Sequence, residues 1–353
     1  MASPLVITAA SALTSYGVGP EAYAQGFEAG PAQFAPMAGS YTQDIFCARV
    51  PSYDARQLLG VRSISNFDRL TLHVCVAVDA LHKRLGFGDA RERRARLADD
   101  RISLVLGSSG PLQSIVDLDL QTIEEPSYVQ PSIVPNLVFN VPASYAAIRH
   151  GIRGSCITLT DGDTSSLKAL AMAATQLESG RIDLALVGGA EEATPAYALY
   201  RAALAAAGGQ TCPRFAEGAA MFALERAEDA AAAGRASIAK LFGCVQVFAP
   251  HDPHAGLAAC IDKLRRRFGD VLDDIGVVYA AQETDLGRVG LDRCRSINLA
   301  DRLGHFGAMS ASMAMLDALV RSHVAAGELL LIVQADREGV CAAGLLQKHA
   351  TLH

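Results

Sequence analysis

The sequence contains no tryptophan, and only 6% of its 353 residues are aromatic. It also lacks a basic excess, because 31 Lys and Arg residues face 37 Asp and Glu residues and the net charge is −6. Proteins that bind nucleic acid neutralise phosphates with basic residues and often stack bases on aromatic side chains. We therefore expect no nucleic-acid partner.

Paired cysteines and long apolar runs are missing as well. None of the eight cysteines lies in a Cys-x-x-Cys pair, a pattern that suits free thiols in a reducing compartment and argues against structural zinc. Residues 1–17 have no basic segment before their apolar stretch, and no apolar run elsewhere is long enough to cross a bilayer. These absences predict a cytoplasmic protein without membrane association.

Motifs for metals and nucleotide cofactors are incomplete. The glycines of "GSSG" (107–110) lack the lysine of a phosphate-binding loop, and "VGGAEE" (187–192) lacks the spaced glycines of a dinucleotide turn. His251 and His254 have the spacing of two metal ligands, but no Cys or Glu lies near them in the sequence. We expect neither a metal nor a cofactor.

Half of the residues are hydrophobic, which is enough for a sizeable core. Short apolar or β-branched runs alternate with amphipathic stretches, many of which end in glycine. Strands are predicted at residues 4–9, 101–110, 156–161, 182–192, 220–225, 275–282 and 328–336, and helices at 68–86, 164–180, 255–269 and 307–327. This alternation predicts an α/β fold. A charged run at 226–236 is the best internal boundary, and it divides the chain into residues 1–236 and 237–353.

A tight acidic turn lies between one predicted strand and the next helix, in "TLTDGDTSSLKAL" (158–170). Asp163 is at its tip, where the N–H groups and the dipole of a helix favour negative charge. Because Asp is a preferred N-cap residue, its carboxylate is expected to accept a hydrogen bond from the N–H of Ser165 or Ser166. Nucleophiles are often mounted at such tips, so a functional role for Asp163 stays open.

A second candidate is His305 in "LGHFGAMSA" (303–311), which precedes a predicted helix. A histidine there can act as an acid or base or donate to an oxyanion. A structural hydrogen bond is the simpler interpretation.

Several segments share a further property, the order in which they occur. They are "LVITAASALTSYG" (5–17), "NFDRLTLHVCVAVDAL" (66–81), "RISLVLGSSG" (101–110), "VPNLVFNVPASYAAIRHGIRGSCITLT" (134–160), "SGRIDLALVGGAEEAT" (179–194), "FAEGAAMFALERAEDAAAAGR" (215–235) and "GHFGAMSA" (304–311). In this order and spacing they resemble the β-ketoacyl-acyl-carrier-protein synthases of the thiolase superfamily, nearly from end to end. The resemblance implies a thiolase-like fold, in which two βαβ-rich halves form a layered α-β-α-β-α core.

The departures from this family coincide with its chemistry. Asp163 stands where the family has its catalytic cysteine. Gln282 replaces the first family histidine and Ala300 the lysine, whereas His305 matches the second histidine. A glycine-rich loop near the C-terminus is replaced by "VQADREGVCAAG" (residues 333 onward).

The losses bear directly on catalysis. Decarboxylative condensation needs a thiolate to carry the acyl group and donors to stabilise the enolate. We therefore expect no catalytic residues, and the chain resembles chain-length factors, the silent ketosynthase-like subunits of type II polyketide and aryl polyene systems. The resemblance implies a heterodimer with an active ketosynthase, an acyl carrier protein as a further partner, and a role in shaping the acyl chain. The residues expected to border that chain are Phe139, Asn140, Val141, Asp163, Thr164 and His305.

Two alternatives stay open. Asp163, His305 and Ser165 or Ser166 are nominally the parts of a hydrolase or acyltransferase site for acyl thioesters. In the second alternative, the chain is a homodimer that binds acyl chains or carrier protein without a ketosynthase partner.

Overall fold

The computed structural model describes residues 3–37, 45–62, 64, 67–87, 97–129, 131–207, 212–280, 284–336 and 338–352. Gln282 therefore lies outside the described residues. Within these ranges the chain forms an α/β fold, as its alternating pattern predicts.

Most strands belong to one 11-stranded sheet in the described part of the chain, ordered β12-β11-β13-β14-β10-β1-β9-β7-β5-β6, with β2 paired to β1. A separate three-stranded sheet has the order β3-β4-β8. The strands are β1 (Leu5–Thr14), β2 (Gly17–Val18), β3 (Ala35–Pro36), β4 (Phe46–Ala48), β5 (Ile102–Gly107), β6 (Cys156–Leu159), β7 (Leu184–Glu191), β8 (Phe215–Ala216), β9 (Gly218–Arg226), β10 (Ala239–Phe248), β11 (Ile275–Ala280), β12 (Arg295–Ile297), β13 (Leu329–Ala335) and β14 (Val340–Lys348).

The helices of the described residues are α1 (Pro20–Ala29), α2 (Ala55–Leu59), α3 (Arg69–Arg84), α5 (Leu112–Glu124), α6 (Val141–His150), α7 (Ser165–Glu178), α8 (Pro195–Ala207), α9 (Ala227–Ala232), α10 (Pro253–Phe268), α11 (Ala300–Leu303) and α12 (Ser310–Val320). Short 3-10 turns precede two of them, η4 (Gly162–Thr164) before α7 and η6 (Gly307–Met309) before α12.

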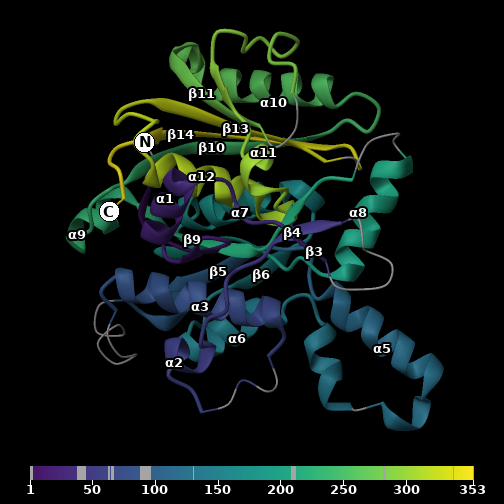
Figure 1. Ribbon diagram of the computed structural model, residues 1–353. Coiled ribbons are helices and arrows are strands. Elements are labelled where there is room, and N and C mark those ends of the chain that lie inside the picture. Colours follow the sequence, from purple (N-terminus) through teal and green to yellow (C-terminus); the bar gives the residue numbers. More distant parts are fainter. Residues whose placement is uncertain are drawn as a thin grey trace.

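The helices and strands form alternating layers (Figure 1). At the top, α10 covers the strands β10, β11, β13 and β14, while α3 and α6 cover the strands at the bottom. Between the two groups of strands lie α7 and α12. All eleven residues of α12 are buried, as expected for a helix that is apolar on nearly every side and is enclosed by a core. This arrangement confirms the predicted layered, thiolase-like architecture.

The predicted strands and helices are present, with ends that differ by up to seven residues, the largest difference being at the helix predicted over 307–327, where α12 ends at Val320. Sequence patterns missed β10 and β14, which pair with each other over most of their length. Both contain small residues that weaken the apolar alternation typical of strands. The predicted boundary at 226–236 contains α9, and the division into residues 1–236 and 237–353 stays a prediction.

One part of the chain projects from the layered body, α5 together with the 3-10 turns η2 (Pro126–Tyr128) and η3 (Pro131–Leu137), at the lower right of Figure 1. No residue of α5 is buried. We call residues 112–139 the α5 arm. Among the described helices, none is both long and apolar enough to cross a membrane.

Candidate functional site

The acidic turn 161–164 joins the end of β6 to the start of α7, as predicted. Gly162 adopts a φ of 53°, a conformation that favours glycine, and Asp163 follows it with only 1% of its surface exposed. The N-cap of α7 is Thr164, and no side chain caps this end of the helix. The prediction that Asp163 caps the helix through Ser165 or Ser166 is therefore wrong.

The carboxylate of Asp163 instead pairs with Arg201 of α8. Nη1 of Arg201 donates to Oδ1 at 2.9 Å and Nη2 donates to Oδ2 at 3.0 Å. This two-point geometry is the strongest kind of ion pair that a carboxylate makes with a side chain. Sequence reasoning missed Arg201, although one signal was present: it is the only charged residue in an otherwise apolar helix, "PAYALYRAALAAA".

His305 completes the cluster from the turn that leads into η6. Its Nδ1 accepts a hydrogen bond from the N–H of Gly307 at 3.1 Å, and its Nε2 lies 3.1 Å from Oδ2 of Asp163. Because Nδ1 is an acceptor, the ring proton is assigned to Nε2, which donates to Asp163. The contact of 3.2 Å between Nε2 and Nη2 of Arg201 brings together two donors that share one carboxylate oxygen.

Arg201 and His305 together keep Asp163 ionised. Burial by itself raises the pKa of Asp163, but His305 and Arg201 outweigh it and hold that pKa well below its usual range. In turn, the Asp163 carboxylate holds the pKa of Arg201 above its usual range, although burial opposes this. Asp163 is thus an anion at neutral pH with partners at both oxygens, which makes it unsuited to attack a thioester carbonyl.

The turn that carries His305 is anchored by a second buried carboxylate. Glu191 is the last residue of β7. Its Oε2 accepts hydrogen bonds from the hydroxyl of Ser109 at 2.6 Å and from the N–H of Ala308 at 3.1 Å. Burial raises the pKa of Glu191 to about 7, and these hydrogen bonds oppose the rise. The end of β7 therefore positions the residues that follow His305.

The serines expected in the hydrolase alternative do not reach His305. Ser165 donates its hydroxyl to the carbonyl of Gly162 at 2.6 Å, and Ser166 accepts from the N–H of Ser312 at 3.3 Å. Both nitrogens of His305 are engaged by other groups. The structure therefore does not assemble a Ser-His-Asp arrangement. Thr164 is buried as well, and its hydroxyl donates to the carbonyl of Asp161.

The predicted pocket residues Phe139, Asn140 and Val141 lie at the base of the α5 arm. Phe139 is exposed and lies close to Gly110, whose missing side chain makes room for the ring. Oδ1 of Asn140 accepts a hydrogen bond from the hydroxyl of Thr158 at 2.9 Å. These residues meet the end of β5 and the strand β6 rather than the Asp163 cluster.

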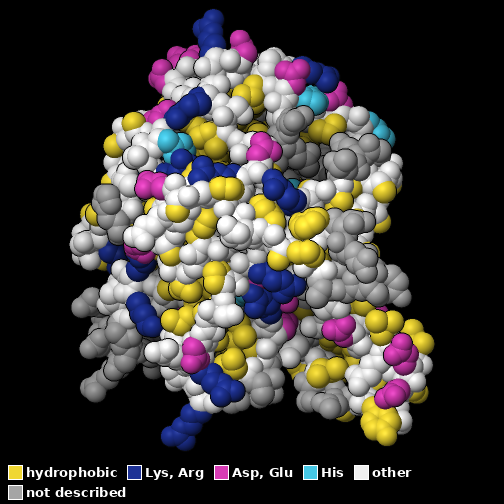
Figure 2. Space-filling view, viewed as in Figure 1, with side chains coloured by type: hydrophobic (Ala, Val, Ile, Leu, Met, Phe, Trp, Pro, Cys, Tyr) yellow, Lys and Arg dark blue, Asp and Glu magenta, His cyan; other side chains and the backbone are white. Residues whose placement is uncertain are grey.

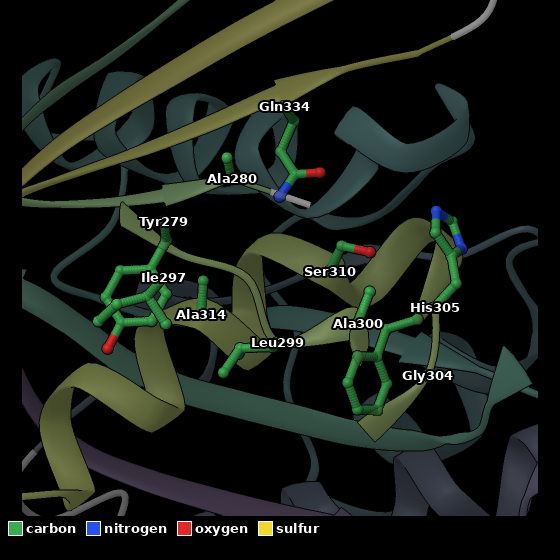
Figure 3. Close-up of a pocket in the computed structure, with 11 residues that line it drawn as sticks. Tyr279, Ala280, Ile297, Leu299, Ala300, Gly304, His305, Ser310, Ala314 and Gln334 are labelled. Atoms are coloured by element: carbon green, nitrogen blue, oxygen red, sulfur yellow. The ribbon is translucent and has the colours of Figure 1, made fainter. Parts of the chain in front are cut away.

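A narrow cavity adjoins the cluster on the other side of His305 (Figure 3). Its volume is about 20 Å³, room for one water molecule. Figure 3 shows Gln334 pointing into it from β13, with His305 at one end and Tyr279 at the other. The methyl group of Ala300 lines this cavity, so no cationic side chain enters from that position. In the part of the chain that the structure describes, no His, Cys, Asp and Glu residues are grouped to hold a metal ion.

Comparisons with known proteins agree with this architecture. Residues 2–230 match the family model described as the N-terminal domain of beta-ketoacyl synthases. A curated relative, 3-oxoacyl-[acyl-carrier-protein] synthase 2 of Vibrio cholerae, is 25% identical over 260 residues. That match covers 67% of this chain and 61% of the length of the relative.

Solved structures resemble the whole chain. The ishigamide ketosynthase/chain length factor is 30% identical, with a TM-score of 0.81, over 98% of this chain and 100% of the other. The ketosynthase ApeO in complex with its chain length factor ApeC, from Xenorhabdus doucetiae, has a TM-score of 0.76 over 98% of each chain. At 15% identity, the second likeness concerns the fold alone.

Proposed function

Because the chain belongs to the β-ketoacyl synthase family, we propose that it is a chain-length-factor-like subunit that pairs with an active β-ketoacyl synthase. In this proposal the chain carries out no condensation of its own. It borders the pocket of its partner and limits the acyl or polyene chain that grows there in polyketide-type or fatty acid synthesis. The likeness to a ketosynthase/chain length factor structure along the whole chain supports this assignment.

The observation that carries the proposal is the Asp163–Arg201–His305 cluster. Asp163 occupies the tip that holds a cysteine in active relatives, as the motif order implies, and its carboxylate is buried and paired at both oxygens. An acyl intermediate needs a thiolate at this tip. A carboxylate held by a guanidinium and an imidazole is a weak nucleophile and leaves no group on which to load the chain.

The α5 arm supports the pairing with a partner. Its exposed hydrophobic side chains are Val116, Leu120, Ile123, Tyr128, Val134, Val138 and Phe139. The surface of the arm shows hydrophobic side chains beside acidic ones (Figure 2). Monomeric proteins rarely expose so many apolar side chains on one segment. Among the described strands, β6 is the last in the sheet, so the backbone groups along its free edge can also meet a partner.

The pocket role rests on the place of Phe139, Asn140 and Val141. Phe139 belongs to the exposed apolar surface of the α5 arm, and the half-buried Asn140 and Val141 follow it in the chain, so a partner bound to the arm would come close to them. We propose that these residues approach the acyl chain of the partner across the interface, and that a carrier protein delivers that chain. The name of the curated relative, an acyl-carrier-protein-dependent synthase, supports the second point. We assign the complex to the cytoplasm, where the eight free thiols would persist.

Co-expression tests the proposal. The full chain is produced with a ketosynthase encoded beside its own gene, and the purified complex is weighed by native mass spectrometry. A stable one-to-one complex whose product length changes when Phe139 is replaced by Ala is the expected result. A homodimer that ignores the ketosynthase would favour the acyl-binding alternative, and turnover of acyl thioesters by the isolated chain would favour an enzyme.

A further inference from the structure

The backbone N–H of Asp163 has a partner from a distant part of the chain. It donates to Oδ2 of Asp336 at 2.8 Å, across 173 residues of sequence. The N–H groups at the start of a helix have no acceptor within the helix, and they attract negative charge. The N–H at the tip before α7 is therefore a natural site for an anion, and here that anion is the side chain of Asp336.

Asp336 is held rigidly in this position. It is buried and lies in the tight connection between β13 and β14. Its Oδ1 accepts from the N–H of Glu338 at 2.7 Å, and its own N–H donates to the carbonyl of Val340 at 2.7 Å. The carboxylate therefore approaches the tip from a turn that fixes its orientation.

The tip itself is adapted to this approach. A Cβ on Gly162 would collide with Oδ2 of Asp336, and the φ of 53° at Gly162 disfavours other residues as well. Burial, followed by the nearby negative charge of Asp163, raises the pKa of Asp336. The structure thus keeps two acidic side chains close together at the tip, although their charges repel.

Acyl transfer makes a specific demand on this N–H. When a sulfur at the tip attacks a thioester, the carbonyl oxygen becomes an oxyanion that needs nearby donors, and the N–H of the residue that bears the sulfur is within reach. We propose that Asp336 blocks this oxyanion site and so forms a barrier to acylation separate from the missing thiol. The proposal rests on the proposed function, because it assumes that the tip is a silenced nucleophile position.

The test restores the thiol and then removes the barrier. Full-length D163C, D163C/D336A and D163C/D336N are incubated with an octanoyl thioester of N-acetylcysteamine. In the reaction, the introduced sulfur forms a bond to the carbonyl carbon, the bond from that carbon to the leaving sulfur breaks, and the thiol proton ends on the released N-acetylcysteamine. The D336N variant is the matched control, because its amide oxygen can still accept from the tip N–H.

Acylation is located by peptide mass spectrometry, which separates position 163 from the eight native cysteines. We expect D163C/D336A to acylate at least about tenfold faster than D163C and D163C/D336N, since losing one oxyanion donor costs about 10²–10³ in rate. Equal rates in D163C and D163C/D336A would overturn the proposal. So would the absence of acylation in D163C/D336A while iodoacetamide still alkylates position 163. If D336A does not fold, D163C/D336G replaces it.

The same preparations separate this inference from the proposed function. Each variant is also mixed with the ketosynthase, and complex formation is measured. If the unmodified chain forms no complex with the ketosynthase, the proposed function is wrong. The rate of acylation at position 163 bears only on the role of Asp336.

Discussion

Arg201 donates hydrogen bonds to both carboxylate oxygens of Asp163, at 2.9 and 3.0 Å, from the helix α8, which begins 32 residues after Asp163. Both side chains are buried, so each charge depends on the other for compensation. Such a pair contributes little net stability compared with apolar residues, but it is costly to break on one side. The pair is thus a sensitive point at which to perturb the proposed silent site.

Removing the cation alone should be strongly destabilising. Arg201→Met leaves the Asp163 carboxylate buried with only His305 as a partner, and we expect a loss of about 3–5 kcal/mol in the free energy of unfolding. Chemical denaturation measures it. The double variant D163L/R201M removes both charges and should lose much less. As a control, Arg265→Gln in the exposed pair with Asp273 should cost less than about 1 kcal/mol. A small effect of R201M would contradict the assigned ion pair.

Glu191 predicts the pH dependence of stability. Its pKa is about 7 in the folded chain, against about 4.3 for an unperturbed glutamate. Between these values the folded chain binds a proton that the unfolded chain has released, so stability falls as the pH rises through this range. Burial, followed by the negative charges of Asp68 and Glu217, raises the pKa of Glu192 to about 7 as well, and this acts in the same direction.

The variant Glu191→Gln tests this explanation. Its amide oxygen can still accept from Ser109 and Ala308, so the fall in stability between about pH 5 and 7 should become shallower. Unfolding free energies measured at several pH values report the slope. Glu228→Gln, at an exposed residue of α9, should leave the slope unchanged. An unaltered slope in E191Q would assign the pH dependence to other groups.

The exposed apolar side chains of the α5 arm predict which surface contacts the ketosynthase. Ile123 is 78% exposed, and a charge there would be buried if a partner covers the arm. We expect Ile123→Asp to weaken the complex with the ketosynthase by at least about tenfold, because burying an unpaired carboxylate is costly. Phe248→Asp, at a residue that is 70% exposed on β10, is the control. Binding measured by analytical ultracentrifugation should change only in I123D, and an equal loss in both variants would argue against the arm.

Restoring the thiol should not restore condensation. By the motif resemblance, D163C still lacks the histidine and the lysine that the family carries at the positions of Gln282 and Ala300, and Ala300 offers only a methyl group to the cavity. We therefore expect no release of carbon dioxide from a malonyl thioester above the wild-type background, even in complex with a ketosynthase whose own cysteine is replaced. Radiolabelled malonyl carrier protein provides the assay. Clear condensation by D163C would show that the functional positions are wrongly assigned.

The sequence predicted the tip and its acidic residue correctly but misjudged the contacts. A strand followed by a glycine and a helix is a local pattern, so the place of Asp163 could be read from neighbouring residues. Its partners come from positions 201, 305 and 336, which local patterns cannot relate to one another. Among neighbouring residues, the N–H groups at the start of α7 were the best donors for the Asp163 carboxylate. In the structure, the guanidinium of Arg201 from α8 donates to it instead.

The strands divide in the same way. Apolar runs such as β7 and β13 are buried on both faces and stand out in the sequence, whereas β10 and β14 were hidden by small residues. By itself, the sequence determined the α/β fold and membership of the family, because periodicity and motif order are properties of short segments. Only the tertiary structure decided that the Asp163 carboxylate is paired with Arg201 and that the Asp163 N–H donates to Asp336. Both facts depend on contacts between segments that the chain brings together only when its core has packed.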